Sequence, residues 1–221
     1  MTDFIIARKN MISNQLKVNN IIETHLLSAI ESVPREIFLP SKLQTKAYLD
    51  EDIQISRNRY MIEPRILGHI LKLSKIRTTD NVLDLVCSTG YTSSVLAKLV
   101  KKVIGIDNNK DLLSKAENNI KNLNISNIKF LFSNPRNFFK KNNKYDAIFI
   151  FGGVEFIPKN ILELLKENGG RLITVLYKDS DKLGRIYLIK KIRNKISAKF
   201  YIETHTPILE DFKKNKKEFI F

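Results

Sequence analysis

A short turn and one aspartate are the residues of this sequence whose types and spacing could bind a nucleoside. The turn Cys87-Ser88-Thr89-Gly90 follows a strand-like run at 82–86, and Asp107 follows a second run, 17 residues after Gly90. In an open α/β sheet, ligands bind outside the carboxyl ends of the strands, where an acidic residue accepts hydrogen bonds from both ribose hydroxyls. The alternative role for Asp107 is a helix N-cap. The order strand, turn, helix, strand, aspartate favours the ribose role.

The composition of the turn indicates which nucleoside it would hold. A pyrophosphate needs close approach of the backbone and several glycines, whereas Gly90 is the turn's single glycine. S-adenosylmethionine has no phosphate, so the crevice floored by Ser88–Gly90 and walled by Asp107 favours a methyl donor over NAD. Cys87 could be a reactive thiol near a helix N-terminus, although a small packing residue is the more common role.

The apolar runs place this turn in an α/β domain. From residue 80 onward, short apolar runs alternate with amphipathic segments of helix length, which is typical of a parallel sheet with helices on both faces. Asn168-Gly169-Gly170 is expected to end the helix before the fifth run. Two further strands, near 184–192 and 199–208, should pair as an antiparallel hairpin. The five runs lie at 82–86, 103–106, 128–132, 147–151 and 172–177.

The first 75 residues have a different character. They lack alternation and predict helices, two of which have apolar faces within 11–16 and 26–33. Pro64 suits the first turn of a third helix. Because no internal repeat and no Pro/Gly/Ser-rich linker interrupts the chain, we expect one domain over 1–221. It should consist of a helical extension at 1–75 and a Rossmann-like core at 76–221.

Composition limits the partners of the protein. A net charge of +15 would suit contact with nucleic acid or a membrane surface. However, lysine is frequent along the whole chain, and no stripe of aromatic and basic residues appears, so general composition is the preferred explanation. The basic tail 213–217 is interpreted as a solvated end. The sequence contains no apolar run of ~18 residues, so no membrane span is expected. The N-terminus is unlike a secretory signal. A single cysteine fits a reducing cytoplasm.

Several segments resemble protein-L-isoaspartate O-methyltransferases. "LLSAIESVPREIFLP" (26–40) and "AYLD" (47–50) are similar to the N-terminal signature of that family, and "VLDLVCSTGY" (82–91) is similar to its acidic-start glycine loop. The segment 145–176 resembles the family's fourth strand, the following loop and the fifth strand. The similarity extends in register over roughly residues 5–190.

The resemblance implies a class I methyltransferase fold with a seven-stranded, mostly parallel sheet. It also implies S-adenosylmethionine as the cofactor and isoaspartyl carboxylates of damaged peptides or proteins as acceptors, in a repair reaction. A carboxylate is already a nucleophile and a sulfonium is already an electrophile, so catalysis should consist mainly of positioning and exclusion of water. No metal is needed, and the three histidines show no ligand spacing. A monomer without membrane contact is expected.

The acceptor motif of the family is altered in this chain. The motif G-x-T-I-S-x-P aligns with 58–64, which places Tyr60 at the threonine and Ile62 at the serine that the family holds near the acceptor. Isoleucine cannot hydrogen-bond a carboxylate. Arg57, Arg59 or the Tyr60 hydroxyl could replace the serine, since an arginine fork suits carboxylates; alternatively, both arginines are solvated loop residues. The predicted catalytic positions are Tyr60, Ile62 and Arg59.

The glycine loop is altered as well. The three glycine positions of the family motif E-x-G-x-G-x-G carry Val86, Ser88 and Gly90. Valine disfavours a positive φ, so Val86 should either change the loop or narrow the pocket, and donor affinity should fall. Asp84 keeps the acidic start. Asn134 replaces an aspartate that contacts the adenine amino group, a bond that an amide oxygen can still accept. The predicted cofactor-binding residues are Asp84, Cys87, Ser88, Gly90, Asp107, Asn108 and Asn134.

Functions from different classes fit these observations. The preferred one is an active isoaspartyl methyltransferase. Val86 and Ile62 motivate the alternative of a catalytically degenerate paralogue with a binding or assembly role, or of an enzyme with a different acceptor. The net charge motivates an RNA methyltransferase, but 151–154 reads Phe-Gly-Gly-Val instead of the Asn/Asp-Pro-Pro-aromatic loop common among base-amine methyltransferases. Nucleic acid is therefore not the favoured partner.

Overall fold

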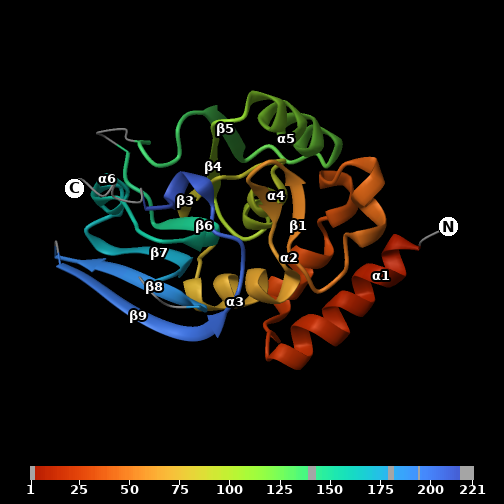
Figure 1. Ribbon diagram of the computed structural model, residues 1–221, viewed down its shortest axis with the longest axis horizontal. Coiled ribbons are helices and arrows are strands. Elements are labelled where there is room, and N and C mark those ends of the chain that lie inside the picture. The colour runs from red at the N-terminus through yellow and green to blue at the C-terminus, as the bar shows by residue number, and fades with distance from the viewer. Residues whose placement is uncertain (1–2, 139–142, 179–181, 194, 215–221) are drawn as a thin grey trace, which may run out of the picture.

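The computed structural model describes residues 3–138, 143–178, 182–193 and 195–214, and a seven-stranded sheet forms the centre of this part of the chain (Figure 1). The strand order is β5-β4-β3-β6-β7-β8-β9. The first five are parallel to one another, and β8 and β9 each pair antiparallel. The predicted α/β fold with a mostly parallel sheet is thus confirmed. The strands are β3 (Asn81–Leu85), β4 (Lys102–Asp107), β5 (Ile128–Phe132), β6 (Ala147–Val154), β7 (Asn168–Leu176), β8 (Gly184–Ile192) and β9 (Lys195–Thr204).

Apolar side chains cover both faces of the sheet. On one face, Val82, Val103 and Phe149 pack with helices α3, α4 and α5, and on the other face Leu83 and Ile148 pack with α6. Consecutive side chains of a strand point to opposite faces, so a strand buried on both faces is a continuous apolar run. This explains why the runs were recognisable in the sequence. The helices are α1 (Phe4–Met11), α2 (Thr24–Glu31), α3 (Pro64–Ser74), α4 (Tyr91–Ala97), α5 (Lys110–Asn122) and α6 (Lys159–Glu163).

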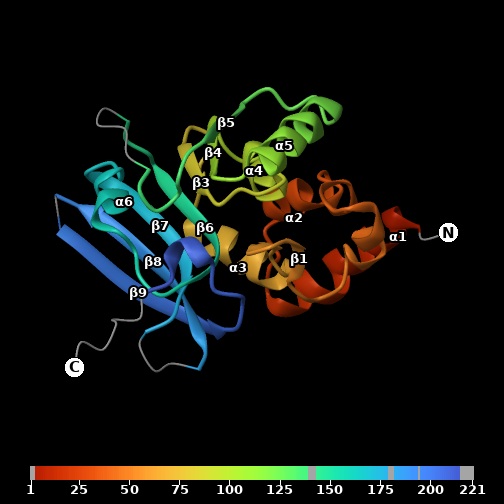
Figure 2. The same cartoon turned by 45° about the horizontal axis from the view of Figure 1, so that its top comes forward.

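The N-terminal segment packs against α3, on the side of the molecule away from β7–β9 (Figures 1 and 2). Its predicted apolar faces are buried, including Met11, Leu16, Leu26 and Ile30. The third helix begins at Pro64, as predicted. Shorter turns complete the segment: the π-helical η1 (Ile12–Leu16) and the 3-10 turns η2 (Lys17–Asn19), η3 (Arg35–Phe38) and η4 (Ser41–Lys46).

The prediction of helix throughout 1–75 is wrong at 53–61. There, β1 (Ile53–Ser56) and β2 (Arg59–Met61) form an antiparallel hairpin. Its turn holds Asn58 at a φ of 59°, a conformation that asparagine adopts more readily than most residues. Strands of four and three residues are too short for their alternation to be recognised. The hairpin brings Arg59 to the carboxyl end of β4.

Two predictions about the last strands need correction. The antiparallel hairpin exists, but its second strand is Lys195–Thr204 instead of 199–208. Most residues of β9 are exposed. The strand therefore has no regular apolar pattern in the sequence that would mark its first residue. The segment 168–170 begins β7, whereas α6 ends earlier, at Glu163. The glycines lie at a register shift in the pairing with β8, which is a common use of glycine in strands.

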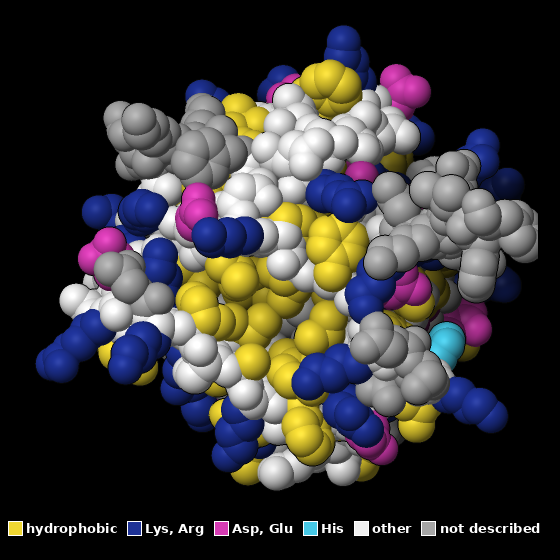
Figure 3. All heavy atoms as spheres, turned by 60° about the vertical axis from the view of Figure 1, so that its left-hand side comes forward, with side chains coloured by type: hydrophobic (Ala, Val, Ile, Leu, Met, Phe, Trp, Pro, Cys, Tyr) yellow, Lys and Arg dark blue, Asp and Glu magenta, His cyan; other side chains and the backbone are white. Residues whose placement is uncertain are grey.

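The outer surface of the sheet edge is partly apolar. On β9, the side chains of Ile196, Phe200 and Tyr201 are 45%, 51% and 41% exposed. Figure 3 shows the left-hand side of Figure 1, where hydrophobic side chains gather and lysine and arginine side chains are spread around them. On this face, the positive charge is therefore not concentrated in one stripe. None of the helices in the described ranges has the length and hydrophobicity to cross a bilayer.

Candidate functional site

The loop from β3 to α4 keeps a left-handed backbone although two of its motif positions lack glycine. Val86, Ser88 and Gly90 have φ values of 64°, 52° and 87°. The amide of Cys87 donates to the Ile106 carbonyl at 3.0 Å, and the Gly90 amide donates to the Cys87 carbonyl at 2.9 Å. A non-glycine residue in this conformation costs about 1–3 kcal/mol. The surrounding hydrogen bonds thus hold Val86 in a strained left-handed conformation.

We predict that Val86→Gly raises the free energy of unfolding by about 1 kcal/mol. The relief of strain at φ 64° should exceed the roughly 0.5–1 kcal/mol that glycine costs through the entropy of the unfolded chain. Urea unfolding measures the change. Val82→Gly is the matched control, because Val82 is buried in the regular part of β3 and its loss should destabilise the protein. A lower free energy of unfolding for Val86→Gly than for the wild type would show that Val86 is not strained.

Asp107 is the centre of the site. Its buried carboxylate accepts hydrogen bonds from the amides of Ser88 and Asn109, each at 3.0 Å. The guanidinium of Arg59 donates to both of its oxygens, with Nε at 3.2 and 3.0 Å and Nη2 at 3.2 Å. A carboxylate offers about four lone-pair sites. Two backbone amides and the arginine fork therefore use the whole hydrogen-bonding capacity of Asp107.

Arg59 connects Asp107 to the C-terminal part of the chain. Its Nη2 donates to the side-chain oxygen of Asn108 at 2.6 Å, and its Nη1 lies 2.9 Å from Oδ2 of Asp211, an ion pair without hydrogen-bond alignment. Asn108 in turn donates to the other oxygen of Asp211 at 2.8 Å. Asp211 lies in the 3-10 turn η5 (Glu210–Phe212). No local sequence pattern predicts this residue, because its hydrogen-bond partner Asn108 is 103 residues away in the chain.

Asp84 lies beneath the loop and is fully buried. Its Oδ2 accepts hydrogen bonds from the hydroxyls of Thr92 at 2.7 Å and Ser93 at 2.6 Å, whereas its Oδ1 has no partner. Burial raises the pKa of Asp84 to about 7; the two hydroxyls lower it and the charge of Asp107 raises it further. Near neutral pH the carboxyl is therefore partly protonated.

Asp84 should make stability pH-dependent. Its folded pKa of about 7 lies above its ordinary value of 3.8, so between these values the folded protein holds a proton that the unfolded chain has released. The free energy of unfolding should consequently fall as pH rises through this interval, by at most about 1.4 kcal/mol per pH unit. Urea titrations from pH 4 to 8 measure the slope. Asp84→Asn, which does not titrate, should lose it.

The comparison with Asp84→Asn is needed because burial also raises the pKa of Glu63 to about 7. Glu63 is present in both proteins, so the difference between their pH profiles isolates Asp84. Equal slopes in the two proteins would show that Asp84 is ionised throughout the interval.

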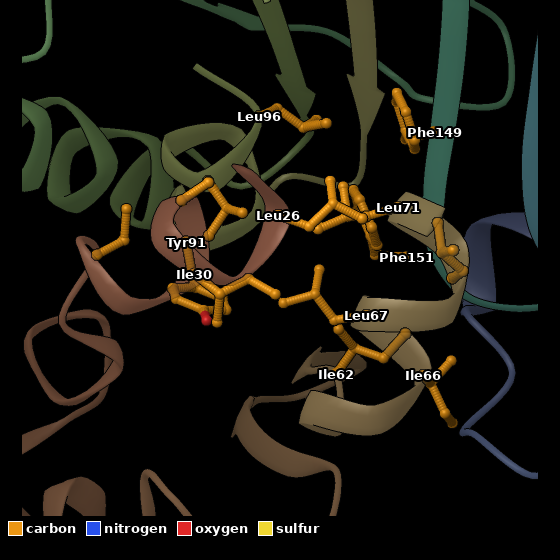
Figure 4. Close-up of a cluster of buried hydrophobic side chains, with 14 of the residues drawn as sticks. Leu26, Ile30, Ile62, Ile66, Leu67, Leu71, Tyr91, Leu96, Phe149 and Phe151 are labelled. Atoms are coloured by element: carbon orange, nitrogen blue, oxygen red, sulfur yellow. The ribbon is translucent and has the colours of Figure 1, made fainter. Parts of the chain in front are cut away.

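The predicted acceptor-side residues do not lie together. Tyr60 lines a cavity of about 20 Å³ with Val86 and Ser88. Ile62 is buried near Leu67 in the hydrophobic cluster between α2 and α3 (Figure 4), and its side chain does not reach this cavity. Arg59 is held at Asp107, as described above. Of the three predicted positions, Tyr60 alone lines the cavity above the loop.

The remaining predicted residues differ in whether they contact the Asp107 site. Asn108 contacts Arg59 directly. Cys87 is buried in an apolar cluster, and burial raises the pKa of its thiol well above its ordinary value, so the group stays a thiol. Asn134 is exposed, and its side chain accepts from the Arg136 amide at 2.9 Å. Its neighbour Ser133 donates its amide to the Asp107 carbonyl, so Asn134 belongs to the adjacent strand end without touching the carboxylate.

Comparisons with known proteins point to one family. The family described as "Protein-L-isoaspartate(D-aspartate) O-methyltransferase (PCMT)" matches residues 7–206. A relative from Shewanella sediminis (strain HAW-EB3), named protein-L-isoaspartate O-methyltransferase 2, is 31% identical over 173 residues, which are 78% of this chain and 70% of the relative. The family match includes the β1–β2 hairpin, the loop after β3 and Asp107.

Solved structures share the fold at lower identity. One, titled protein-L-isoaspartate O-methyltransferase, is 22% identical with a TM-score of 0.76, and the match covers 90% of this chain but 64% of that one. A second, from Plasmodium falciparum, is 22% identical with a TM-score of 0.77, and covers 96% of this chain and 100% of that one. That protein is described as a beta-aspartate methyltransferase in complex with S-adenosyl-L-homocysteine.

Proposed function

Because the chain belongs to the protein-L-isoaspartate(D-aspartate) O-methyltransferase family, we propose that it transfers the methyl group of S-adenosylmethionine to isoaspartyl carboxylates of peptides or proteins. The observation that carries this proposal is the crevice at the carboxyl ends of β3 and β4, where a left-handed loop adjoins the buried carboxylate of Asp107. Ligands of open α/β sheets bind at such strand ends. The S-adenosyl-L-homocysteine of the structurally similar Plasmodium protein supports the choice of donor.

The polar groups of the crevice suit an adenosyl donor, although the free volume is small. Ser88 lines the cavity, and its Oγ is buried without a hydrogen-bond partner; such groups are normally satisfied by a ligand or water. The cavity of about 20 Å³ beside Tyr60 has room for about one water molecule. Binding of the donor therefore requires side chains at the crevice to move.

In the proposed reaction, the donor supplies a methyl group on a positively charged sulfur, and an oxygen of the acceptor carboxylate takes that methyl while the sulfur keeps the electron pair. No general base is needed, because the acceptor is already ionised. The chain's own residues position the two groups, which contributes up to ~7–11 kcal/mol in favourable cases. Asp107 would orient the ribose. The Tyr60 hydroxyl would orient the acceptor, and Phe151, which lines the same cavity, would exclude water.

We also propose that the protein acts as a monomer in the cytoplasm. The single cysteine of the chain is a buried free thiol, which suits a reducing compartment. Proteins that carry isoaspartyl residues are its proposed substrates in the repair of damaged chains.

The test is a methyl-transfer assay together with donor binding. Folded protein should bind S-adenosylhomocysteine in calorimetry and should transfer labelled methyl groups from S-adenosylmethionine to an isoaspartyl peptide. The same peptide with a normal aspartyl residue is the control and should remain unlabelled. Binding without transfer would assign the chain a binding role. Absence of both from folded protein would overturn the proposal.

A further inference from the structure

Arg59 occupies the hydrogen-bonding positions on Asp107 that a ribose would need. A ribose donates two hydroxyl hydrogens to such a carboxylate, whereas both oxygens of Asp107 already accept from Arg59 and from the backbone amides of Ser88 and Asn109. The amide bonds belong to the loop itself. The contact that a ligand can displace is therefore the one from the arginine side chain.

We propose that Arg59 is a guard of the donor site: its guanidinium and the donor ribose exclude each other at Asp107, so the donor binds only when Arg59 leaves. This proposal rests on the proposed function, because it takes Asp107 as the ribose acceptor. It makes Arg59 a residue that sets donor affinity, in place of the acceptor contact that the altered motif suggested. The acceptor-side role then falls to other residues of the hairpin.

A cleft beside Arg59 can accommodate its side chain in a second position. Arg59 borders a cleft of about 390 Å³ that is also lined by Asn58, Asn109 and Glu210. Its position at the start of β2, directly after the left-handed turn residue Asn58, puts it at the tip of a two-stranded hairpin. Rotation of the side chain into this cleft would free both oxygens of Asp107 without moving the sheet.

The C-terminal segment holds the guard in its closed position. Asp211 is paired with Arg59 and accepts from Asn108, and it is anchored by its neighbour Phe212, which is fully buried against the sheet. The carbonyl of Phe212 accepts from the Glu155 amide at 3.0 Å. Because Asp107 and Asp211 both attract the guanidinium, weakening either contact should increase the fraction of open sites.

The guard lowers the apparent affinity for the donor by the fraction of molecules that are open. A variant without the guanidinium should therefore bind the donor more tightly, whereas a merely structural arginine would give weaker binding when removed. This opposite direction separates the two roles. For an open fraction of about one tenth, the expected gain is about tenfold.

The experiment is calorimetric titration of the full chain with S-adenosylhomocysteine. Arg59→Gln should bind about tenfold more tightly than the wild type, and Asp211→Asn, which keeps Arg59 but loosens its hold, should show a smaller gain. Arg77→Gln is the matched control: it removes the same charge from an exposed position before β3, at the opposite end of the sheet, and should leave affinity unchanged. Far-ultraviolet circular dichroism checks that each variant is folded.

The outcomes separate this proposal from the proposed function. If the wild type binds and both variants bind equally or more weakly, Arg59 is not a guard, while the methyltransferase assignment stands. If folded wild type does not bind and Arg59→Gln does, the guard and the ribose role of Asp107 are supported, whereas the wild-type chain lacks the proposed activity. If no folded variant binds, the donor site itself is absent and both proposals fail. Should Arg59→Gln prove unfolded, Asp211→Asn alone decides, through a gain or its absence.

Discussion

Asp107→Asn is expected to lower the free energy of unfolding by about 3 kcal/mol. The substitution keeps the shape of the side chain but removes the charge that faces the buried guanidinium of Arg59. Breaking a buried ion pair by removing one partner costs about 3–5 kcal/mol, because the other charge stays buried. Asp211 still compensates part of the charge of Arg59, so the expected value lies at the lower end. Urea unfolding at neutral pH measures it.

The double variant Arg59→Gln/Asp107→Asn tests the cause of this loss. Without either charge, no group is left buried and unpaired, so the double variant should recover much of the stability that Asp107→Asn loses. The coupling free energy of such a cycle for residues in direct contact is about 0.5–3 kcal/mol, and we expect a value near the upper end. Additive losses would show that the two side chains contribute independently and that their ion pair is not what stabilises the crevice.

Arg35→Ala is expected to destabilise the protein by about 4 kcal/mol, or roughly 10 °C in melting temperature. Arg35 is fully buried; its Nε donates to the Ala47 carbonyl at 2.7 Å and its Nη2 donates to the Ile62 carbonyl at 2.9 Å. Its guanidinium carbon also lies 4.9 Å from the centre of the Tyr91 ring. Truncation would leave a large cavity and two buried carbonyls without donors, each of which is destabilising.

Thermal unfolding of Arg35→Ala and Arg35→Lys provides the measurement and its control. Lysine keeps the positive charge and much of the aliphatic stem but lacks the planar fork, so it cannot donate to two separate carbonyls in the same geometry. We expect Arg35→Lys to lose about half as much stability as Arg35→Ala. Losses below about 1 kcal/mol in both variants would mean that the N-terminal segment does not depend on this arginine to join η3 with the start of α3.

The sequence was sufficient to predict the sheet because its central strands are buried on both faces. The run 147–151, for example, lies within β6, which is buried from end to end. The β1–β2 hairpin was missed because its strands contain four and three residues. β9 was misplaced for a different reason: its exposed side chains follow no pattern that burial would impose.

The site was predictable only where it depends on the order of elements. The spacing between the loop and Asp107 follows from the strand–helix–strand unit, and the structure brings the Ser88 amide to the Asp107 carboxylate. The partner of Asp107 could not be predicted, because Arg59 is 48 residues away and reaches it through the unpredicted hairpin. Likewise, Asn108 and Asp211 are 103 residues apart, and no local pattern encodes their contact.

The left-handed Val86 means that the shape of this turn is specified by what surrounds it. The Ile106 carbonyl and the Asp107 carboxylate each accept a hydrogen bond from a backbone amide of the turn. These bonds to the end of β4 stabilise the left-handed conformation even with a β-branched residue at position 86. Two positions of the turn thus keep a positive φ with a valine and a serine in place of glycine. A valine can therefore occupy a left-handed position of this fold when the neighbouring strand supplies hydrogen-bond acceptors for the amides that follow it.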